Sequence, residues 1–155
     1  MTQEEIVKKI EENFEEQITG VYYFAGQGNV SVKAKKILDI CKFLRDEPGL
    51  EFDYLADLAG ADYPDRPYEE GRFEVVYNLY STKRNHRIRI KVGLPEDNPV
   101  VESVVGLWVT ADWHEREAFD LYGIKFNNHP NLKRILMPDD YQWHPLRKEF
   151  PVQGY

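Results

Sequence analysis

The sequence predicts an α+β protein in which helices pack on one side of a mainly antiparallel sheet, followed by an extended proline-rich C-terminal tail. Three observations support this prediction. Two helical patterns come early in the chain, alternating strand patterns follow them, and four of the nine prolines lie near the C-terminus. Segregated helices and strands are typical of α+β folds. With 155 residues, of which 42% are hydrophobic, the chain is long enough for one domain.

We expect residues 1–126 to form the α+β domain, and residues 127–155 to form a tail that belongs to the same domain and faces a partner. The N-terminal helix is predicted from apolar residues at every fourth position, and Thr2 followed by Glu5 fits a capping box. The apolar positions are Ile6, Ile10, Phe14 and Ile18. The solvated face of this helix carries Glu11, Glu12, Glu15 and Glu16.

A second helix is predicted after Ser31, whose hydroxyl can cap it, and it should end before Pro48 and Gly49. Its apolar stripe includes Cys41, the only cysteine of the chain. Because buried thiols in apolar surroundings are unreactive, we expect Cys41 to be a core residue rather than a nucleophile. The full stripe is Ala34, Ile37, Leu38, Cys41 and Leu44.

Alternation with period two predicts antiparallel strands at residues 73–79 and 86–94, joined by a hairpin loop. The second strand places its cations opposite its isoleucines, so one sheet face should be basic and either solvated or in contact with a partner. These cations are Arg87, Arg89 and Lys91. A turn at residues 26–29 should separate two short strands, and further strands are predicted at residues 103–109 and 52–58.

Composition excludes several classes of protein. The net charge of −7 argues against a general nucleic-acid binder, because phosphate backbones require a basic surface. One cysteine cannot form an intrachain disulfide or a four-thiolate iron–sulfur site, and a reducing compartment suits such a chain. No stretch approaches the ~20 apolar residues that span a bilayer, and the acidic N-terminus does not resemble a signal peptide. We therefore expect membrane contact only through partners.

The stretch ADWHEREAFDLYGIKF concentrates charged residues in a short helix predicted at residues 113–122. Asp112 fits the N-cap of this helix, and Glu115 has the capping-box position three residues later. Gly123 stands where a left-handed C-cap would fall. Capping alone would therefore explain two of the acidic residues.

The same helix raises the question of catalysis. At helical spacing Arg116 faces Asp120, which predicts ion pairs. A catalytic carboxylate pair needs convergent placement and separated pKa values, whereas structural ion-pair networks also gather titratable groups. His114 lacks a second histidine four residues later for a zinc pair. We favour a structural role, and keep as the weaker alternative a stand-alone hydrolase that uses Glu115, Glu117 and Asp120.

The segment after this helix is broken by prolines and rich in aromatic residues, and it carries the basic pairs Lys133-Arg134 and Arg147-Lys148. Such a segment cannot form its own core layer and more often lies over a surface. Arginines held there would suit carboxylates of a neighbouring protein, because the guanidinium group binds them in bidentate fashion. The alternative is a tail that packs on its own domain.

Three motifs follow one another over roughly the last third of the chain. They are WHEREAFDLYGIKF from Trp113 to Phe126, then His129-Pro130 with Leu132 and Arg134-Ile135-Leu136, and PLRKEFP from Pro145 to Pro151. Their order and spacing resemble the 30 kDa subunit family of respiratory complex I, the proton-pumping NADH–quinone oxidoreductase. Asn128 and Glu149 replace the usual Gly and Asp of that family, and Asn tolerates left-handed backbone geometry.

The resemblance implies a non-redox scaffold subunit of the peripheral arm, which supports electron transfer from NADH to quinone coupled to proton translocation. Its implied partners are the quinone-site subunit, related to hydrogenase large subunits, and a neighbouring iron–sulfur subunit. No catalytic residue, bound cofactor or metal is expected in this chain, since FMN, iron–sulfur clusters and quinone would belong to other subunits. The implied location is the cytoplasmic side of the inner membrane, or the matrix side in mitochondria.

The resemblance also implies which residues form the family motif and the subunit interface. The acidic helix and its arginine would be a rigid charged face that orders the tail or a partner. The alternative within this broad class is the equivalent subunit of a membrane-bound hydrogenase or of a related ferredoxin-, deazaflavin- or plastoquinone-linked complex. The implied residues are Trp113, Glu115, Arg116, Glu117, Asp120, Gly123, His129, Pro130, Arg134, Pro145, Leu146, Arg147 and Lys148.

Overall fold

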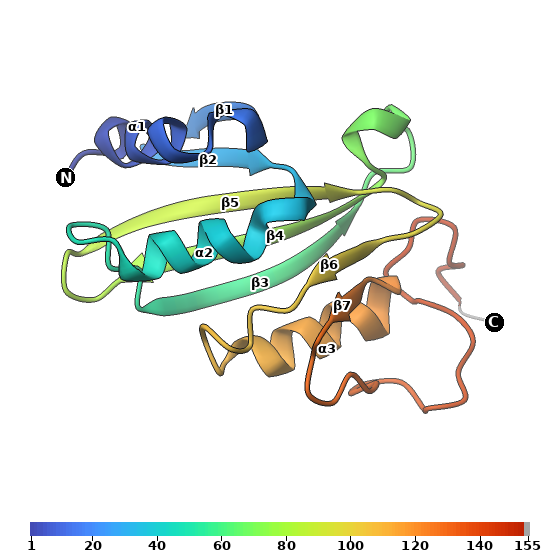
Figure 1. The fold of residues 1–155 in the computed structure, drawn as a ribbon. Helices are drawn as coiled ribbons and strands as arrows, with labels where there is room; N and C mark the ends of the chain where they lie inside the picture. The colour runs from blue at the N-terminus through green and yellow to red at the C-terminus, as the bar shows by residue number, and fades with distance from the viewer. Residues whose placement is uncertain (154–155) are drawn as a thin grey trace.

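The computed structural model describes residues 1–153 and contains one five-stranded sheet with helices packed against it (Figure 1). The strand order is β1-β2-β5-β4-β3, and helices α1 and α2 lie over one face. This confirms the predicted α+β class. The strands are β1 (Ile18–Phe24), β2 (Gln27–Val32), β3 (Tyr54–Asp62), β4 (Phe73–Ser81) and β5 (His86–Leu94). The helices are α1 (Gln3–Phe14), α2 (Ile37–Asp46) and α3 (Ala111–Tyr122).

The sheet is mixed because one neighbouring pair of its strands is parallel. Strands β2 and β5 run parallel, whereas β1–β2, β4–β5 and β3–β4 are antiparallel. The predicted β4–β5 hairpin is confirmed and extends to the pair Ser81–His86. A turn separates β1 and β2 as predicted, but it consists of Ala25 and Gly26, which adopt positive φ angles, whereas residues 27–29 of the predicted turn belong to β2.

Helix α1 begins as the sequence predicts. Thr2 and Glu5 form a capping box, in which each side chain binds the backbone of the other residue. Ile6 and Ile10 are fully buried in the core, but the helix ends at Phe14. Ile18, the last member of the predicted helical stripe, instead opens strand β1 after a 3-10 turn over Glu15–Gln17.

Helix α2 begins later than predicted. Ser31 lies in β2 and caps nothing, because the chain first makes a 3-10 turn over Ala34–Lys36 before α2 starts at Ile37. The register of the buried face shifts accordingly: Ile40 is fully buried, whereas Leu38 is exposed. Cys41 lies in the core as expected, and burial raises the pKa of its thiol.

The segment after β5 also differs from the prediction. Residues 103–109 form turns rather than a strand, and the short strand β6 is Val100–Glu102. It pairs in parallel with β7 (Lys125–Asn127), which follows α3. Strand β3 runs over 54–62 instead of 52–58. Helix α3 lies beside β3, and the tail loops around α3 (Figure 1).

Candidate functional site

The site is built around α3. The sequence predicted one end of this helix correctly and the other end incorrectly. The helix begins at Ala111 with Thr110 as N-cap, and no side chain caps it, so the predicted Asp112 cap and Glu115 capping box are wrong. At the other end the prediction is confirmed: Gly123 adopts a left-handed conformation with φ of 79° and ψ of 18°. Glycine is favoured there because it has no Cβ.

Glu115 is fully buried on the inner side of α3. Its carboxylate accepts hydrogen bonds from Ser103 Oγ at 2.6 Å and from the backbone N–H of Val104 at 2.8 Å. Burial, and to a smaller extent the nearby Asp112 and Glu102 carboxylates, raise the pKa of Glu115 to about 7 against the opposing effect of these bonds. Glu115 therefore holds the turn after β6 against the helix.

Asp120 is also fully buried, and it organises the start of the tail. Its Oδ2 accepts from three consecutive backbone N–H groups, those of Ile135 at 3.1 Å, Leu136 at 2.7 Å and Met137 at 3.0 Å. Its Oδ1 lies 2.9 Å from Nη1 of Arg134. Burial alone would raise the pKa of Asp120, but these donors outweigh it and hold the pKa below its usual range.

Arg116 does not pair with Asp120, which corrects the prediction from helical spacing. Its guanidinium donates to the backbone carbonyl of Lys133 at 3.1 Å and stacks over the ring of Trp113, with 5.0 Å from Cζ to the centroid. Glu117 and Trp113 are exposed. The charged residues of α3 thus point to different sides, and the helix has no single charged face.

The two buried carboxylates are engaged in packing the chain. Glu117 lines a hollow of about 250 Å³ between β3 and α3, but neither Glu115 nor Asp120 contributes to its wall. The three acids that the hydrolase alternative requires therefore do not converge on this hollow. A catalytic pair needs such convergence around a substrate.

The PLRKEFP motif is anchored at the C-terminus of α3. Arg147 Nε donates to the carbonyl of Tyr122 at 2.6 Å, and the N–H of Leu146 donates to the carbonyl of Leu121 at 3.0 Å. These carbonyls belong to the last turn, where a helix leaves acceptors without intrahelical donors. The Arg147 guanidinium also stacks over Phe73 at the start of β4, with 4.8 Å to the centroid.

A second anchor of the tail was missed by the sequence interpretation. Arg72 makes a bidentate pair with the buried carboxylate of Asp62 at 2.7 and 2.8 Å, and it also binds Glu96 and Glu149. The backbone N–H of Lys148 donates to Asp62 at 2.7 Å. Asp62 and Arg72 lie far from the motifs in sequence, so only the register of β3 and β4 brings them to the tail.

His129 links the second motif to the start of α3. Its side chain is buried, with Nε2 at 3.0 Å from Asp112 Oδ1, and Nδ1 accepts from the backbone N–H of Asn131 at 2.9 Å. Because Nδ1 accepts, a neutral ring carries its proton on Nε2, which donates to the backbone carbonyl oxygen of Asp112 at 3.3 Å. The preceding Asn128 adopts a φ of 63°, as expected for a residue that replaces Gly. Pro130 is exposed.

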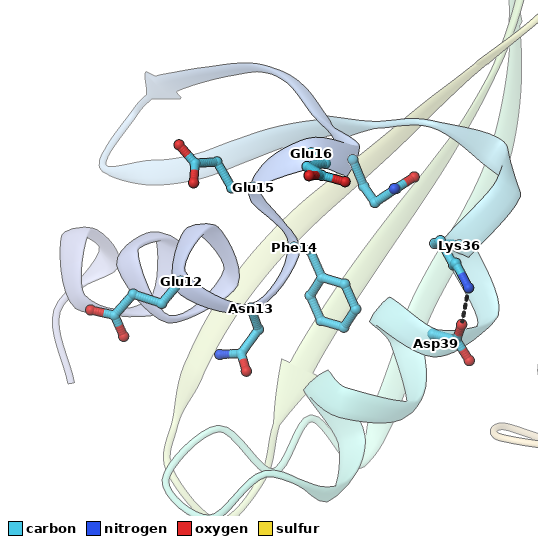
Figure 2. A pocket seen from close by; sticks show the side chains of 8 residues that line it. Glu12, Asn13, Phe14, Glu15, Glu16, Lys36 and Asp39 are labelled. Carbon is cyan, nitrogen blue, oxygen red and sulfur yellow. Dashed lines mark ion pairs between the residues drawn. The ribbon is translucent and has the colours of Figure 1, made fainter.

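Outside α3 an acidic hollow lies between the end of α1 and the start of α2, and it measures about 430 Å³ (Figure 2). The ring of Phe14 lies between these helices, with Glu12, Glu15 and Glu16 around it. Those carboxylates are exposed, as predicted for the solvated face. Among residues 1–153, no group of three or more His, Cys, Asp or Glu side chains is placed to hold a metal.

Comparison with known proteins identifies the family. The family model described as respiratory-chain NADH dehydrogenase, 30 kDa subunit, matches residues 30–155. The chain belongs to this family. As a member, it is a subunit of complex I, the NADH–quinone oxidoreductase. The resemblance of the three motifs is thereby confirmed.

Two relatives, both named as the same subunit of NADH-quinone oxidoreductase, show how far this membership extends. The relative from Roseiflexus sp. is 46% identical over 95% of this chain and 83% of its own length. The relative from Geobacter sulfurreducens is 44% identical over 96% of this chain and 89% of its own length. Relatives with this name do not favour the alternative of a hydrogenase-type complex.

Two solved structures share the fold. A trypsin-resistant fragment of Nqo5 is 28% identical, covers 85% of this chain and all of its own, and has a TM-score of 0.73. A chain of the membrane-bound sulfane sulfur reductase, an archaeal respiratory membrane complex, covers 96% of this chain and 85% of its own, with a TM-score of 0.78. That chain is 24% identical, so the likeness concerns the fold alone.

Proposed function

We propose that this chain is a non-redox scaffold subunit of the peripheral arm of complex I, whose tail docks next to the quinone-site subunit. In this role it supports electron transfer from NADH to quinone, coupled to proton translocation, by holding other subunits in place. The isolated chain has no catalytic activity under this proposal. FMN, the iron–sulfur clusters and the quinone are carried by or between other subunits.

The observation that carries the proposal is a tail that is ordered by buried polar anchors while several of its large apolar side chains are exposed. Asp120 and Arg134 fix residues 134–137, yet Leu136 in that segment is 61% exposed. Trp143 and Leu146 follow, with exposed fractions of 41% and 48%.

Exposed aromatic and aliphatic residues on an ordered backbone are what an interface core requires, because little entropy is lost when they become buried. On α3, Trp113 is a further exposed aromatic residue, with an exposed fraction of 62%. Residues 127–155 are accordingly the partner-facing part of the domain, of which residues 154–155 lie outside the described residues. The neighbouring iron–sulfur subunit is the second partner in the proposal.

The proposed location follows from the partners. Among residues 1–153, no helix has both the length and the apolar character needed to cross a bilayer. Membrane contact then goes through the membrane-bound part of the complex. The subunit is assigned to the cytoplasmic side of the inner membrane, or to the matrix side in a mitochondrion.

The test removes outward-facing apolar groups and leaves the buried anchors Asp120 and Arg134 intact. Leu136→Ser and Trp113→Ser should lower incorporation of the chain into the complex, seen on native gels of detergent-solubilised membranes, and should lower NADH–quinone activity in parallel. Phe24→Ser is the matched control, because Phe24 is 70% exposed on the distant β1–β2 hairpin. Surface substitutions usually change stability by only about 0.5 kcal/mol, so all three purified variants should unfold like the parent chain. Full incorporation of both tail-side variants would refute the tail as docking segment.

A further inference from the structure

The face of the sheet opposite α1 and α2 carries a row of cations on β5. Ile88, Ile90 and Val92 of this strand are fully buried under the helices. Arg87, Arg89 and Lys91 alternate with them and therefore point to the opposite, open face. The structure thus places the predicted basic row on the open face, which α1 and α2 leave uncovered.

The arginines of this row are held by neutral groups. Arg89 Nε donates to the amide oxygen of Asn78 at 2.8 Å. Arg89 Nη1 lies 3.5 Å from the amide oxygen of Asn29, a residue that is fully buried. Arg87 stacks over Tyr80, with 5.2 Å from Cζ to the ring centroid. Within residues 1–153, no carboxylate lies within ion-pair distance of either arginine.

The surrounding carboxylates do not neutralise this end of the face. Asp57 is in the same register row as Arg89, but β4 separates them, a distance of about two strand spacings or 9–10 Å. Asp57 lies 3.4 Å from His114 instead. At the other end of the row, Lys91 pairs with Glu74 at 4.0 Å. Uncompensated positive charge is therefore confined to the end around Arg87 and Arg89, in a chain whose net charge is −7.

We propose that the open face around Arg87 and Arg89 is a second docking surface, which binds an acidic segment of another subunit of the complex. Alternate residues of a strand lie about 7 Å apart on one face, so alternate carboxylates of an extended segment can meet both guanidinium groups. Guanidinium groups bind carboxylates through two parallel hydrogen bonds, and these two are already oriented by Asn78 and Tyr80.

The charge balance favours a protein segment over other polyanions. A nucleic acid or an anionic membrane would meet two free cations here within a strongly acidic surface, and such partners require many cations acting together. A short acidic segment needs only two cations. The proposal rests on membership of the complex I family and not on the docking of the tail. The tail lies beyond the edge strand β3, whereas Arg87 and Arg89 lie on the open face of the sheet.

The first experiment places a photo-crosslinker on the same open face, two strands away from Arg87, and leaves both arginines intact. Tyr54 is 47% exposed and lies in the same register row as Tyr80 and Arg87, so p-benzoylphenylalanine at Tyr54 replaces one aromatic ring with another. After irradiation of the intact complex, mass spectrometry should identify a peptide rich in Asp and Glu from another subunit. Crosslinks to lipid only, to a segment without carboxylates, or to no subunit would overturn the proposal.

The second experiment changes the charge. Arg87→Glu should reduce incorporation into the complex about tenfold, more strongly at low than at high salt, because the interaction is between charges. Lys42→Glu, at an exposed position on α2, is the control with the same charge change on the helix-covered side. Changing the crosslinked carboxylate to Lys should restore incorporation of Arg87→Glu. Equal incorporation of Arg87→Glu and Lys42→Glu, or failure of the swap to restore it, would count against the proposal.

These outcomes are separable from those of the tail. Loss with Leu136→Ser and Trp113→Ser but not with Arg87→Glu would leave the tail as docking segment and refute the second surface. Loss with Arg87→Glu but with neither tail-side variant would support the second surface and refute the tail as docking segment.

Discussion

Asp120→Asn gives the sharpest test of how the tail is ordered. Oδ2 of the carboxylate accepts hydrogen bonds from three backbone N–H groups, and Oδ1 accepts one from the guanidinium of Arg134. An asparagine keeps the shape but has one acceptor oxygen. Its NH₂ group must face either the three N–H donors or the guanidinium, so donors oppose donors in both orientations.

The expected cost follows from burial. The Asp120 side chain is fully buried and that of Arg134 is 10% exposed, so the substitution leaves a largely buried cation without its anion. Breaking such a pair costs about 3–5 kcal/mol. We expect the free energy of unfolding in urea to fall by about this amount, and the backbone amides of residues 135–137 to exchange hydrogen about tenfold faster or more.

The control is Glu117→Gln, which makes the same chemical change at an exposed position of the same helix. It should change the free energy of unfolding by less than about 0.5 kcal/mol. If Asp120→Asn unfolds at the same urea concentration as the parent chain, and residues 135–137 exchange at parental rates, Asp120 does not order the tail.

Three further perturbations test other parts of the site. The pKa of Glu115 is raised to about 7 in the folded chain, so between about pH 4.5 and about pH 7 its carboxyl ionises only in the unfolded chain. The free energy of unfolding should therefore fall by about 3 kcal/mol as the pH rises over this range, and urea titrations of Glu115→Gln should lack this slope. Gly123→Ala would force a non-glycine residue into φ of 79° and place a Cβ 2.6 Å from Arg147 Nη2, so the melting temperature should fall, for a cost of about 1–2 kcal/mol. Arg72→Met leaves the Asp62 carboxylate buried without its cation, so the free energy of unfolding in urea should fall by about 3–5 kcal/mol.

Each of these has a distinguishing result. A parental pH slope in Glu115→Gln would mean that another group titrates. An unchanged melting temperature in Gly123→Ala would show that Arg147 and His144 move away at no cost. Arg84→Met is the control for Arg72→Met, since Arg84 forms an exposed pair with Glu51, and exposed ion pairs contribute little to stability. Equal losses in the two Met variants would contradict the importance of the buried pair.

Sequence periodicity predicted what depends on local patterns. The capping box at Thr2, the β4–β5 hairpin and the left-handed Gly123 are local, and all three are confirmed. The predicted cap at Asp112 was wrong because the same residue types serve a tertiary role. Asp112 faces His129, and no capping rule anticipates a partner 17 positions away.

The site was predicted less completely than the fold. The motif residues of α3 and the tail were found through family resemblance, but the burial of Glu115 and Asp120 was not, because helical spacing places charges on faces without telling which face meets the core. The pair of Asp62 and Arg72 carried no sequence signal, since it depends on strand register and on a tail that begins some sixty residues later.

The parallel pairing of β2 with β5 sets an order on folding. Residues 29–32 pair with residues 89–92, so β1, β2 and α1 cannot join the sheet until β5 has left the ribosome. The β4–β5 hairpin closes a loop of only a few residues and loses little entropy, whereas the β2–β5 contact must close about sixty. Contacts of such separation slow folding, and until they form the apolar face of the N-terminal hairpin stays open to water and to chaperones.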